Sequence, residues 1–338
     1  MGQIRVLVLD DSMVFREVLT RGLEVDPLIK VVAKAENPFD AIDKIETFKP
    51  DVITCDVHMP KMDGIEFIRQ LMPQHPVPII VVSAINEAVF DAMNAGAVDF
   101  VTKPNIQSPQ SVENFIVNLI QKVKEASKAK IVDLGTTSVE KESQMDLTSH
   151  RKIIAIGAST GGTEAIFQVL KGLPKNIPGI VIVQHIPPQF SRMFAERLNN
   201  QLHFDVCEAQ GGEWIEPGKV IIAPGDKHMA VRRVGDKIKV EVFNGEKVNG
   251  HCPSVDVLFE SVAKEFGPSA LGVILTGMGY DGAKGILSMK RKGARTIGQD
   301  EGTSVVYGMP KAAFEVGGVE RQYPLNQIAH GLCVMLKS

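Results

Sequence analysis

The amino-acid sequence predicts two α/β domains, each built on a mainly parallel sheet and joined by a linker. A chain of 338 residues is too long for one ordinary hydrophobic core. In both halves, short apolar runs alternate with segments of helical period, the pattern of βαβ units. Between them, Ser127–His150 has no aromatic residue and many Ser and Thr, which is typical of a linker with a reach of roughly 25–30 Å. We therefore expect domains at 1–122 and 151–338, with the linker at 123–150.

Five apolar runs in the first half are expected to form a five-stranded parallel sheet with helices on both faces: Arg5–Leu9, Val31–Ala35, Asp51–Cys55, Ile79–Val82 and Phe100–Thr102. Between the first two runs, the apolar residues Val14, Val18, Leu19 and Leu23 fall on one face of a predicted helix.

The second half repeats this theme around four runs expected to be buried parallel strands: Ile153–Ile156, Gly179–Val183, Ala270–Leu275 and Arg295–Ile297. Apolar residues recur at helical spacing from Val255 to Phe266 and predict an amphipathic helix, with Ser254 placed to cap it. Alternating residues between Phe204 and Phe243 predict antiparallel hairpins inserted into this otherwise parallel α/β domain.

Composition excludes several classes of protein. The formal net charge of −3 gives no general attraction to nucleic acid or to an anionic membrane. No apolar run approaches the roughly 20 residues of a spanning helix, and the start MGQIRVLVLDD lacks the plan of a signal peptide, so we expect a protein that is not inserted in a membrane. The four cysteines are widely separated, which argues against disulfides and structural zinc and is consistent with the cytoplasm.

Polar residues gather at the expected carboxyl ends of the first five strands: Asp10, Asp11, Asp56, Ser83 and Lys103. Ligands of open α/β sheets lie at this edge. Three carboxylates at one edge repel each other and need a cation, and an all-oxygen set suits Mg²⁺. A carboxylate beside Mg²⁺ and a lysine can accept a phosphoryl group. A single Asp in this position could simply cap a helix, but the full set, with DVHMPKMDG around Asp56, is far more specific.

With these motifs, residues 1–122 resemble a response-regulator receiver domain, which has a flavodoxin-like fold. The resemblance implies that Asp56 is the phospho-acceptor. It also implies that Asp11, Asp56 and the backbone carbonyl of His58 bind Mg²⁺, with Asp10 acting through water. His58 stands where a glutamate is usual in methylesterase receivers. Because the ligand is the carbonyl, this change bears on the lifetime of the phosphorylated form rather than on the metal.

The same resemblance implies roles for three further residues and a partner. Ser83 and Lys103 would contact the phosphoryl group, and Phe100 would reorient on activation. The phosphodonor would be a histidine kinase of the CheA type.

In the second half, IIAIGASTGG runs from a predicted strand into a glycine-rich turn and a helix. Gly157–Gly161 has the spacing G-x-S-x-G, which can expose the hydroxyl of Ser159 on a tight turn. Glycine-rich turns also bind nucleotide phosphates. However, the Walker lysine is missing and no acidic residue lies between Glu164 and Glu196 to bind a ribose, so that alternative is weak. A third interpretation gives the glycines a packing role only.

A serine nucleophile needs a base and a group that orients the base. His185 in VIVQHIPP and Asp281 in TGMGYDG follow predicted strands at the same edge as Ser159. Rival bases and acids lie in the same half: His228, His251, Asp226 and Asp300. The chain order Ser–His–Asp differs from that of α/β-hydrolases and indicates another scaffold.

Five motifs in order across 151–338 resemble the catalytic domain of CheB-family chemotaxis methylesterases: GASTGG, VIVQHIPP, IIAPGDKHM, CPSVDVLF and ILTGMGYDG. The resemblance implies Ser159 as nucleophile, His185 as general base, Asp281 as its orienting acid and the backbone amide of Met278 as an oxyanion donor. It implies no cofactor for the esterase chemistry.

By this resemblance the protein hydrolyses glutamate γ-methyl esters on methyl-accepting chemotaxis receptors, releasing methanol, and deamidates receptor glutamines. Large substrates require an open cleft, which the receiver would cover until Asp56 is phosphorylated. Two other classes of function fit the sequence less well. A DNA-binding output domain is disfavoured, because the second half has no helix-turn-helix and no basic stripe. A catalytically silent adaptor is disfavoured by the Ser, His and Asp set.

Overall fold

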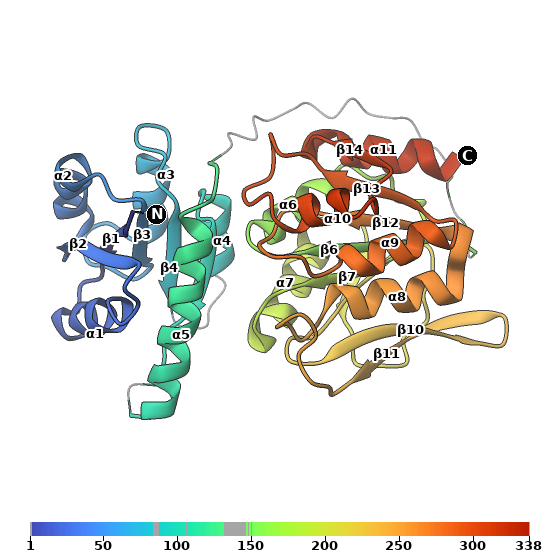
Figure 1. Ribbon diagram of the computed structural model, residues 1–338, viewed down its shortest axis with the longest axis horizontal. Helices are drawn as coiled ribbons and strands as arrows, with labels where there is room; N and C mark the ends of the chain where they lie inside the picture. Colours follow the sequence, from blue (N-terminus) through green and yellow to red (C-terminus); the bar gives the residue numbers. More distant parts are fainter. Residues whose placement is uncertain are drawn as a thin grey trace. The chain divides into compact units, whose positions relative to one another are not determined.

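The computed structural model describes residues 2–83, 88–105, 107–131, 147, 149 and 151–337. It divides into two compact units, residues 1–131 and 132–338, which we describe separately (Figure 1). The last helix of the first unit continues to Ala126. Most of the linker expected at 123–150 lies outside the described residues and stays a prediction.

The first unit is a five-stranded parallel sheet, as the sequence predicts, and its strands have the order β2-β1-β3-β4-β5. Crossover helices connect successive strands, which is the arrangement that right-handed βαβ units require. Its elements are β1 (Ile4–Leu9), α1 (Met13–Leu23), β2 (Ile29–Ala35), α2 (Pro38–Phe48), β3 (Val52–Asp56), α3 (Gly64–Leu71), β4 (Ile79–Ser83), α4 (Ala88–Asn94), β5 (Asp99–Thr102) and α5 (Pro109–Ala126).

The predicted inner face of α1 is partly wrong. Leu19 and Leu23 are buried, but Val14 is 68% exposed. Phe15 is buried instead and packs against Phe115 of α5, with ring centroids 5.9 Å apart. Phe15 lies four residues before Leu19, so it satisfies helical spacing as well as the valine does, and its ring buries more apolar surface.

The second unit has a seven-stranded parallel sheet in the order β14-β13-β12-β6-β7-β9-β8, and a separate antiparallel hairpin, β10–β11 (Figure 1). Its elements are β6 (Ile153–Ala158), α6 (Gly162–Lys171), β7 (Gly179–Gln184), α7 (Pro188–Gln201), β8 (Asp205–Glu208), β9 (Lys219–Ile222), β10 (His228–Val234), β11 (Lys237–Phe243), α8 (Val255–Phe266), β12 (Ala270–Ile274), α9 (Ala283–Arg291), β13 (Arg295–Gln299), α10 (Met309–Glu315), β14 (Arg321–Tyr323) and α11 (Leu325–Lys337).

The inserted hairpin is confirmed for β10–β11, but the antiparallel expectation is wrong for β8 and β9. These two strands pair in parallel with each other, and β9 pairs in parallel with β7. Each is only four residues long, too short for a period to distinguish an edge strand of the main sheet from a hairpin strand.

Helix α8 has the bounds that the sequence predicts, and its whole apolar stripe is buried against the sheet. Ser254 precedes this helix, yet its hydroxyl makes no capping hydrogen bond. The hydroxyl donates instead to the carboxylate of Asp281, at 2.8 Å. The capping prediction for Ser254 is therefore wrong, and the side chain is directed toward the carboxyl edge of the sheet.

Candidate functional site

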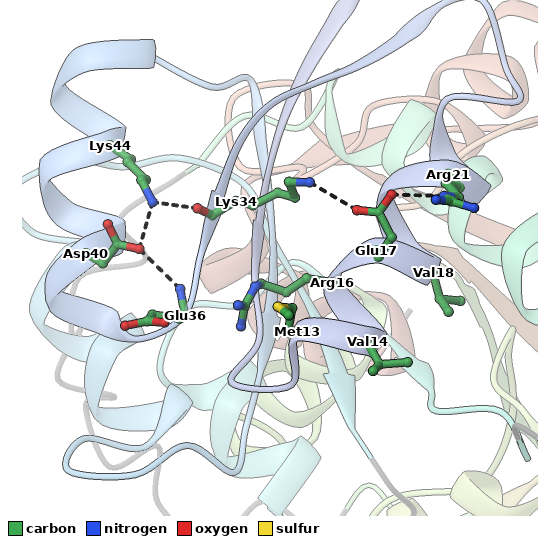
Figure 2. Close-up of a pocket in the computed structure, with 10 residues that line it drawn as sticks. All are labelled: Met13, Val14, Arg16, Glu17, Val18, Arg21, Lys34, Glu36, Asp40 and Lys44. Atoms are coloured by element: carbon green, nitrogen blue, oxygen red, sulfur yellow. Dashed lines mark hydrogen bonds and ion pairs between the residues drawn. The ribbon is translucent and has the colours of Figure 1, made fainter.

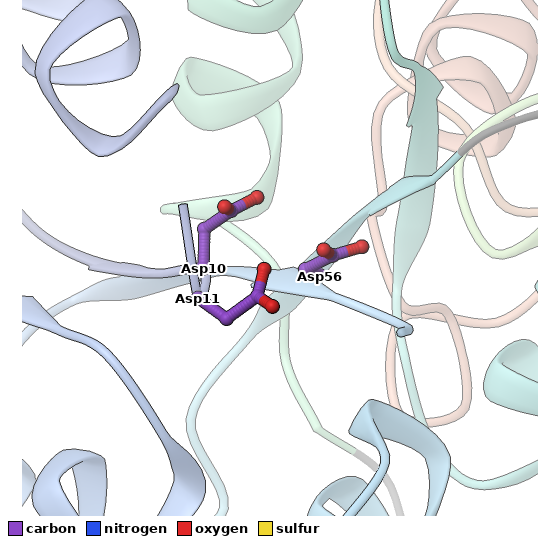
Figure 3. Close-up of side chains that lie close together, drawn as sticks. All are labelled: Asp10, Asp11 and Asp56. Atoms are coloured by element: carbon purple, nitrogen blue, oxygen red, sulfur yellow. The ribbon is translucent and has the colours of Figure 1, made fainter. Parts of the chain in front are cut away.

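Three carboxylates gather at the carboxyl edge of the first sheet. Asp10 and Asp11 follow β1, and Asp56 ends β3. One oxygen from each lies within 4.8 Å of the other two (Figure 3). Asp10 and Asp56 are buried and Asp11 is exposed. This is an all-oxygen set, open to solvent on one side, which fits a hard divalent cation such as Mg²⁺.

Lys103 binds two of these carboxylates. Its Nζ lies 2.9 Å from Asp10 Oδ2 and 2.7 Å from Asp56 Oδ2. Burial raises the pKa of Asp10, and Lys103 opposes that shift. Burial lowers the pKa of Lys103, but the bonds to Asp56 and Asp10 outweigh it, so the net shift is upward. The ammonium therefore stays charged. It compensates part of the negative charge of the three carboxylates, and a cation can neutralise the rest.

The other predicted receiver residues lie on or just after β3, β4 and β5 of the same sheet. The Ser83 hydroxyl, at the end of β4, is buried and has no hydrogen-bond partner in the described structure. The backbone amide of His58 donates to Asp56 Oδ1 at 3.3 Å. Phe100 is buried, with its ring edge-on to Phe90. An unpaired buried hydroxyl at the end of β4 can donate a hydrogen bond to an incoming anionic group.

A groove of about 1020 Å³ runs along α1 and α2 at the β2 edge of the same sheet (Figure 2). Its walls are joined by Lys34 of β2, which pairs with Glu17 of α1 at 3.1 Å, and by Lys44 of α2, which donates to the Lys34 carbonyl at 2.6 Å. It contains none of the three clustered carboxylates. The groove is thus distinct from the acidic site.

In the second unit, Ser159 lies on the turn between β6 and α6 and is half-buried. Its amide donates to the carbonyl of Thr276, at 3.0 Å, and its carbonyl accepts from Gly162, at 2.7 Å. Gly161 has φ +75°, a conformation that favours glycine and makes the turn this tight. One hydrogen bond therefore closes the turn, and another joins it to the segment that follows β12.

His185 follows β7, the strand beside β6. Ala158 pairs with Gln184 in the parallel register, and the His185 amide donates to the Ala158 carbonyl at 3.1 Å. The chain positions directly after each strand, Ser159 and His185, therefore lie next to each other. No hydrogen bond joins their side chains in the described structure, and His185 Nδ1 is buried without a partner there.

Asp281 lies 2.9 Å from His185, joined through Oδ2 and Nε2. Four further groups donate to the same carboxylate: Asn249 Nδ2, Ser254 Oγ and the amides of Val255 and Asp256. Burial raises the pKa of Asp281. The hydrogen bond to His185, the charge of His185 and the hydrogen bonds from the other donors outweigh burial and hold the pKa of Asp281 well below its usual range. Asp281 is thus ionised at the N-terminus of α8, and its carboxylate accepts a hydrogen bond from the N–H at His185 Nε2.

The rival residues have other partners. His228 accepts from the Ser254 amide at Nδ1, at 3.3 Å, and its Nε2 bonds the Glu246 carbonyl, at 2.8 Å. Asp300 accepts from the amide and the hydroxyl of Thr303. Asp226 is exposed in a turn with φ +59°. Of the acids that the sequence left open, Asp281 is the one bonded to His185.

The loop after β12 closes against the serine turn. A Cβ on Gly277 would lie 2.7 Å from Ser159 Cβ, so only glycine permits this approach. The Gly277 carbonyl accepts from Met309, at 2.7 Å, and its amide donates to Val306, at 3.0 Å. The next amide, that of Met278, donates no hydrogen bond within the described structure. A free amide next to the serine is available to bind an oxyanion.

The sequence interpretation missed Asn249. Its side-chain amide bridges two carboxylates, at 2.8 Å to Asp281 and 2.7 Å to Asp256. The local signal was present, because Asn249–Gly250 is the dipeptide that favours tight turns. Only the tertiary structure shows that this turn reaches the acid.

The fold and these two clusters define a receiver unit followed by an α/β unit in which Ser159, His185 and Asp281 lie at the carboxyl edge of a parallel sheet. Family models match both: "Response regulator receiver domain" over residues 6–112 and "CheB methylesterase" over residues 154–332. A protein-glutamate methylesterase/protein-glutamine glutaminase of Syntrophomonas wolfei is 52% identical, over 98% of this chain and 97% of that protein. One from Salmonella typhimurium is 44% identical, over 100% of this chain and 98% of that protein.

Among solved structures, the CheB methylesterase catalytic domain of Thermotoga maritima is similar, with a TM-score of 0.53 and 38% identity. It covers 55% of this chain and 97% of that one. The chain belongs to the CheB methylesterase family. None of the described helices is both long and apolar enough to span a membrane.

Proposed function

We propose that the second unit hydrolyses γ-methyl esters of glutamate and side-chain amides of glutamine on chemotaxis receptors. The two reactions are those in the names of its relatives, and the receptors are our proposal. The observation that carries this proposal is the bond from His185 Nε2 to Asp281, beside the serine turn. It leaves Nδ1 as the basic nitrogen, and Nδ1 has no other partner in the described structure.

The chemistry follows from these positions. Ser159 Oγ attacks the ester carbonyl carbon and its proton passes to His185 Nδ1, while Asp281 stabilises the imidazolium. The amide of Met278 donates to the oxyanion. The tetrahedral species then collapses, and Nδ1 returns the proton to the leaving oxygen, which departs as methanol. Water attacks the acyl-serine by the same route in reverse, releasing glutamate and restoring Ser159. With an amide substrate, ammonia leaves instead.

No hydrogen bond joins the Ser159 and His185 side chains in the described structure, which is compatible with this route because catalytic hydrogen bonds often form only in the enzyme–substrate complex. The acyl chemistry needs no metal in this scheme, since every proton is moved by His185.

For the first unit, we propose phosphorylation of Asp56 by a histidine kinase of the CheA type. Asp11, Asp56 and the His58 carbonyl would hold Mg²⁺, with Asp10 acting through water. The ion supplies positive charge that offsets the phosphoryl oxygens. Lys103 and Ser83 would bind those oxygens, and Phe100 would reorient when they are bound. Because the kinase and the receptor segments are cytoplasmic by this proposal, the protein acts in the cytoplasm.

Ser159→Ala tests the proposal directly. It removes only the attacking oxygen, so methanol release from methylated receptor membranes should fall by roughly 10³-fold or more. The circular dichroism spectrum and the phosphorylation of Asp56 should not change. A variant that kept more than a few per cent of wild-type turnover would rule out the serine mechanism.

A further inference from the structure

A tight turn reaches the acid–base pair from the segment between β11 and α8. Residues Val248 and His251 exchange two backbone hydrogen bonds, at 2.9 and 3.0 Å. The two residues between them, Asn249 and Gly250, have φ +53° and +85°. Positive φ at both central positions defines a type I′ turn, for which Asn-Gly is the preferred sequence. The turn is therefore a rigid element that the local sequence itself specifies.

Residues of this turn contact both Asp281 and His185. Asn249 donates to Asp281 Oδ1 at 2.8 Å and also to Asp256, which in turn accepts from the Gly285 amide at 2.6 Å. His251 stacks on the ring of His185, with centroids 3.7 Å apart and planes 6° apart. Two residues apart in sequence, Asn249 and His251 thus contact the acid and the base.

We propose that the turn at residues 248–251 is a clamp for the catalytic pair and that His251 is the positioning residue for His185. This inference rests on the proposed function and adds a residue to it. A single hydrogen bond at Nε2 fixes one atom of the His185 ring but leaves the ring free to rotate about that contact. A flat ring stacked on its face removes this freedom and keeps the Nδ1 lone pair directed to one side.

The effect should appear in turnover rather than in binding. Misplacing a catalytic group by about 1 Å can cost on the order of 10²-fold. Ester recognition depends on other surfaces, so the loss should fall on kcat while KM stays near its wild-type value.

The test compares His251→Leu with His251→Phe in the full-length protein. Leucine fills a similar volume without a flat face, whereas phenylalanine keeps the stack and removes the ring nitrogens. We expect His251→Leu to lower kcat by about 10–100-fold with little change in KM. His251→Phe should retain kcat within about threefold of wild type, which is under 1 kcal/mol. The readouts are methanol release from methylated receptor membranes and the rate at which a fluorophosphonate labels Ser159, which does not depend on receptor binding.

Asn249→Gly is the companion variant. Glycine accepts φ +53° and so keeps the turn, but it removes both hydrogen bonds to the carboxylates. Loss of the hydrogen bond to Asp281 should lower kcat and the labelling rate by about tenfold, the rate equivalent of one hydrogen bond. This variant also tests the clamp if His251→Leu fails to fold.

Three outcomes would overturn the proposal: wild-type kcat in His251→Leu, equal losses in the Leu and Phe variants, or a loss confined to KM. Ser159→Ala separates this failure from failure of the proposed function. If Ser159→Ala is inactive while His251→Leu and Asn249→Gly behave as wild type, only the clamp is wrong. An active Ser159→Ala would instead refute the hydrolase mechanism.

Discussion

At the scale of single residues, Asp281 links His185 to the framework of the second unit. It accepts hydrogen bonds from the imidazole of His185, from two side chains and from two backbone amides at the start of α8. A helix N-terminus carries positive partial charge, so it stabilises the ionised carboxylate. The carboxylate that we propose orients His185 is therefore itself held by several hydrogen bonds, which leaves little freedom for the imidazole to take the other tautomer.

Asp281→Asn should lower kcat by roughly 10³–10⁴-fold, because the new amide group can favour the wrong His185 tautomer. Asp226→Asn and Asp300→Asn are matched controls at positions that do not contact His185, and we expect turnover close to wild type. All three are compared by methanol release after unfolding curves have confirmed that they are folded. Similar losses in all three would mean that the effect follows general damage to folding and would remove the basis for choosing Asp281.

The carboxyl ends of parallel strands meet at one edge of a sheet, so the sequence could predict that Ser159, His185 and Asp281 lie close together. The same reasoning could not choose between Asp281 and Asp300, which both follow strands. Their difference lies in tertiary contacts: Asp300 bonds within its own loop and Asp281 reaches His185. Asn249 could not be predicted for a similar reason, since the loop after β11 reaches Asp281 through a tertiary contact. The roles of these residues stay predictions.

At the scale of elements, the sequence predicts what depends on burial better than what depends on local hydrogen bonds. The stripe of α8 is fully buried as predicted, because its apolar residues have no alternative face. Ser254 has the right position for a cap, yet the Asp281 carboxylate takes over the helix amides and the serine hydroxyl as well. A charged acceptor forms stronger hydrogen bonds than a hydroxyl does, and no local pattern reveals its presence.

The contact between the β12 loop and the serine turn allows an element-scale prediction. Gly277→Ala would place a Cβ 2.5 Å from Met309 Sδ and 2.7 Å from Ser159 Cβ. We expect a loss of about 1–3 kcal/mol in the free energy of unfolding, typical of overpacking, and at least a tenfold fall in kcat because the serine turn must move. Denaturant unfolding and methanol release measure the two effects.

Gly235→Ala is the control for that variant. Gly235 lies in the β10–β11 turn with φ +60°, and nothing lies within 4 Å of its added Cβ. Alanine in this conformation should cost about 1 kcal/mol of stability while leaving kcat unchanged. If Gly277→Ala also kept wild-type kcat, the close packing of the β12 loop would not be what positions Ser159.

At the scale of the whole molecule, the chain combines two units that each have their own sheet and core. Separate family models match them, and a relative's catalytic domain has been solved by itself. The second unit is therefore expected to fold without the first. Control of one by the other must then be a coupling free energy between two sites, which is commonly about 1–3 kcal/mol, or roughly 5–150-fold in an equilibrium.

We predict that the unphosphorylated receiver lowers turnover at Ser159. A chain that begins at residue 148 should then have higher basal turnover than the full chain, by about 5–150-fold. Phosphorylation should raise the turnover of the full chain because it adds charge at the Asp56 site and favours another receiver surface. Asp56→Asn should stay at the basal rate with phosphodonor and Mg²⁺ present. Equal turnover of the shortened and full chains on receptor membranes would show that the unphosphorylated receiver does not restrain the hydrolase, and control would then have to act by recruitment or by direct activation of the hydrolase.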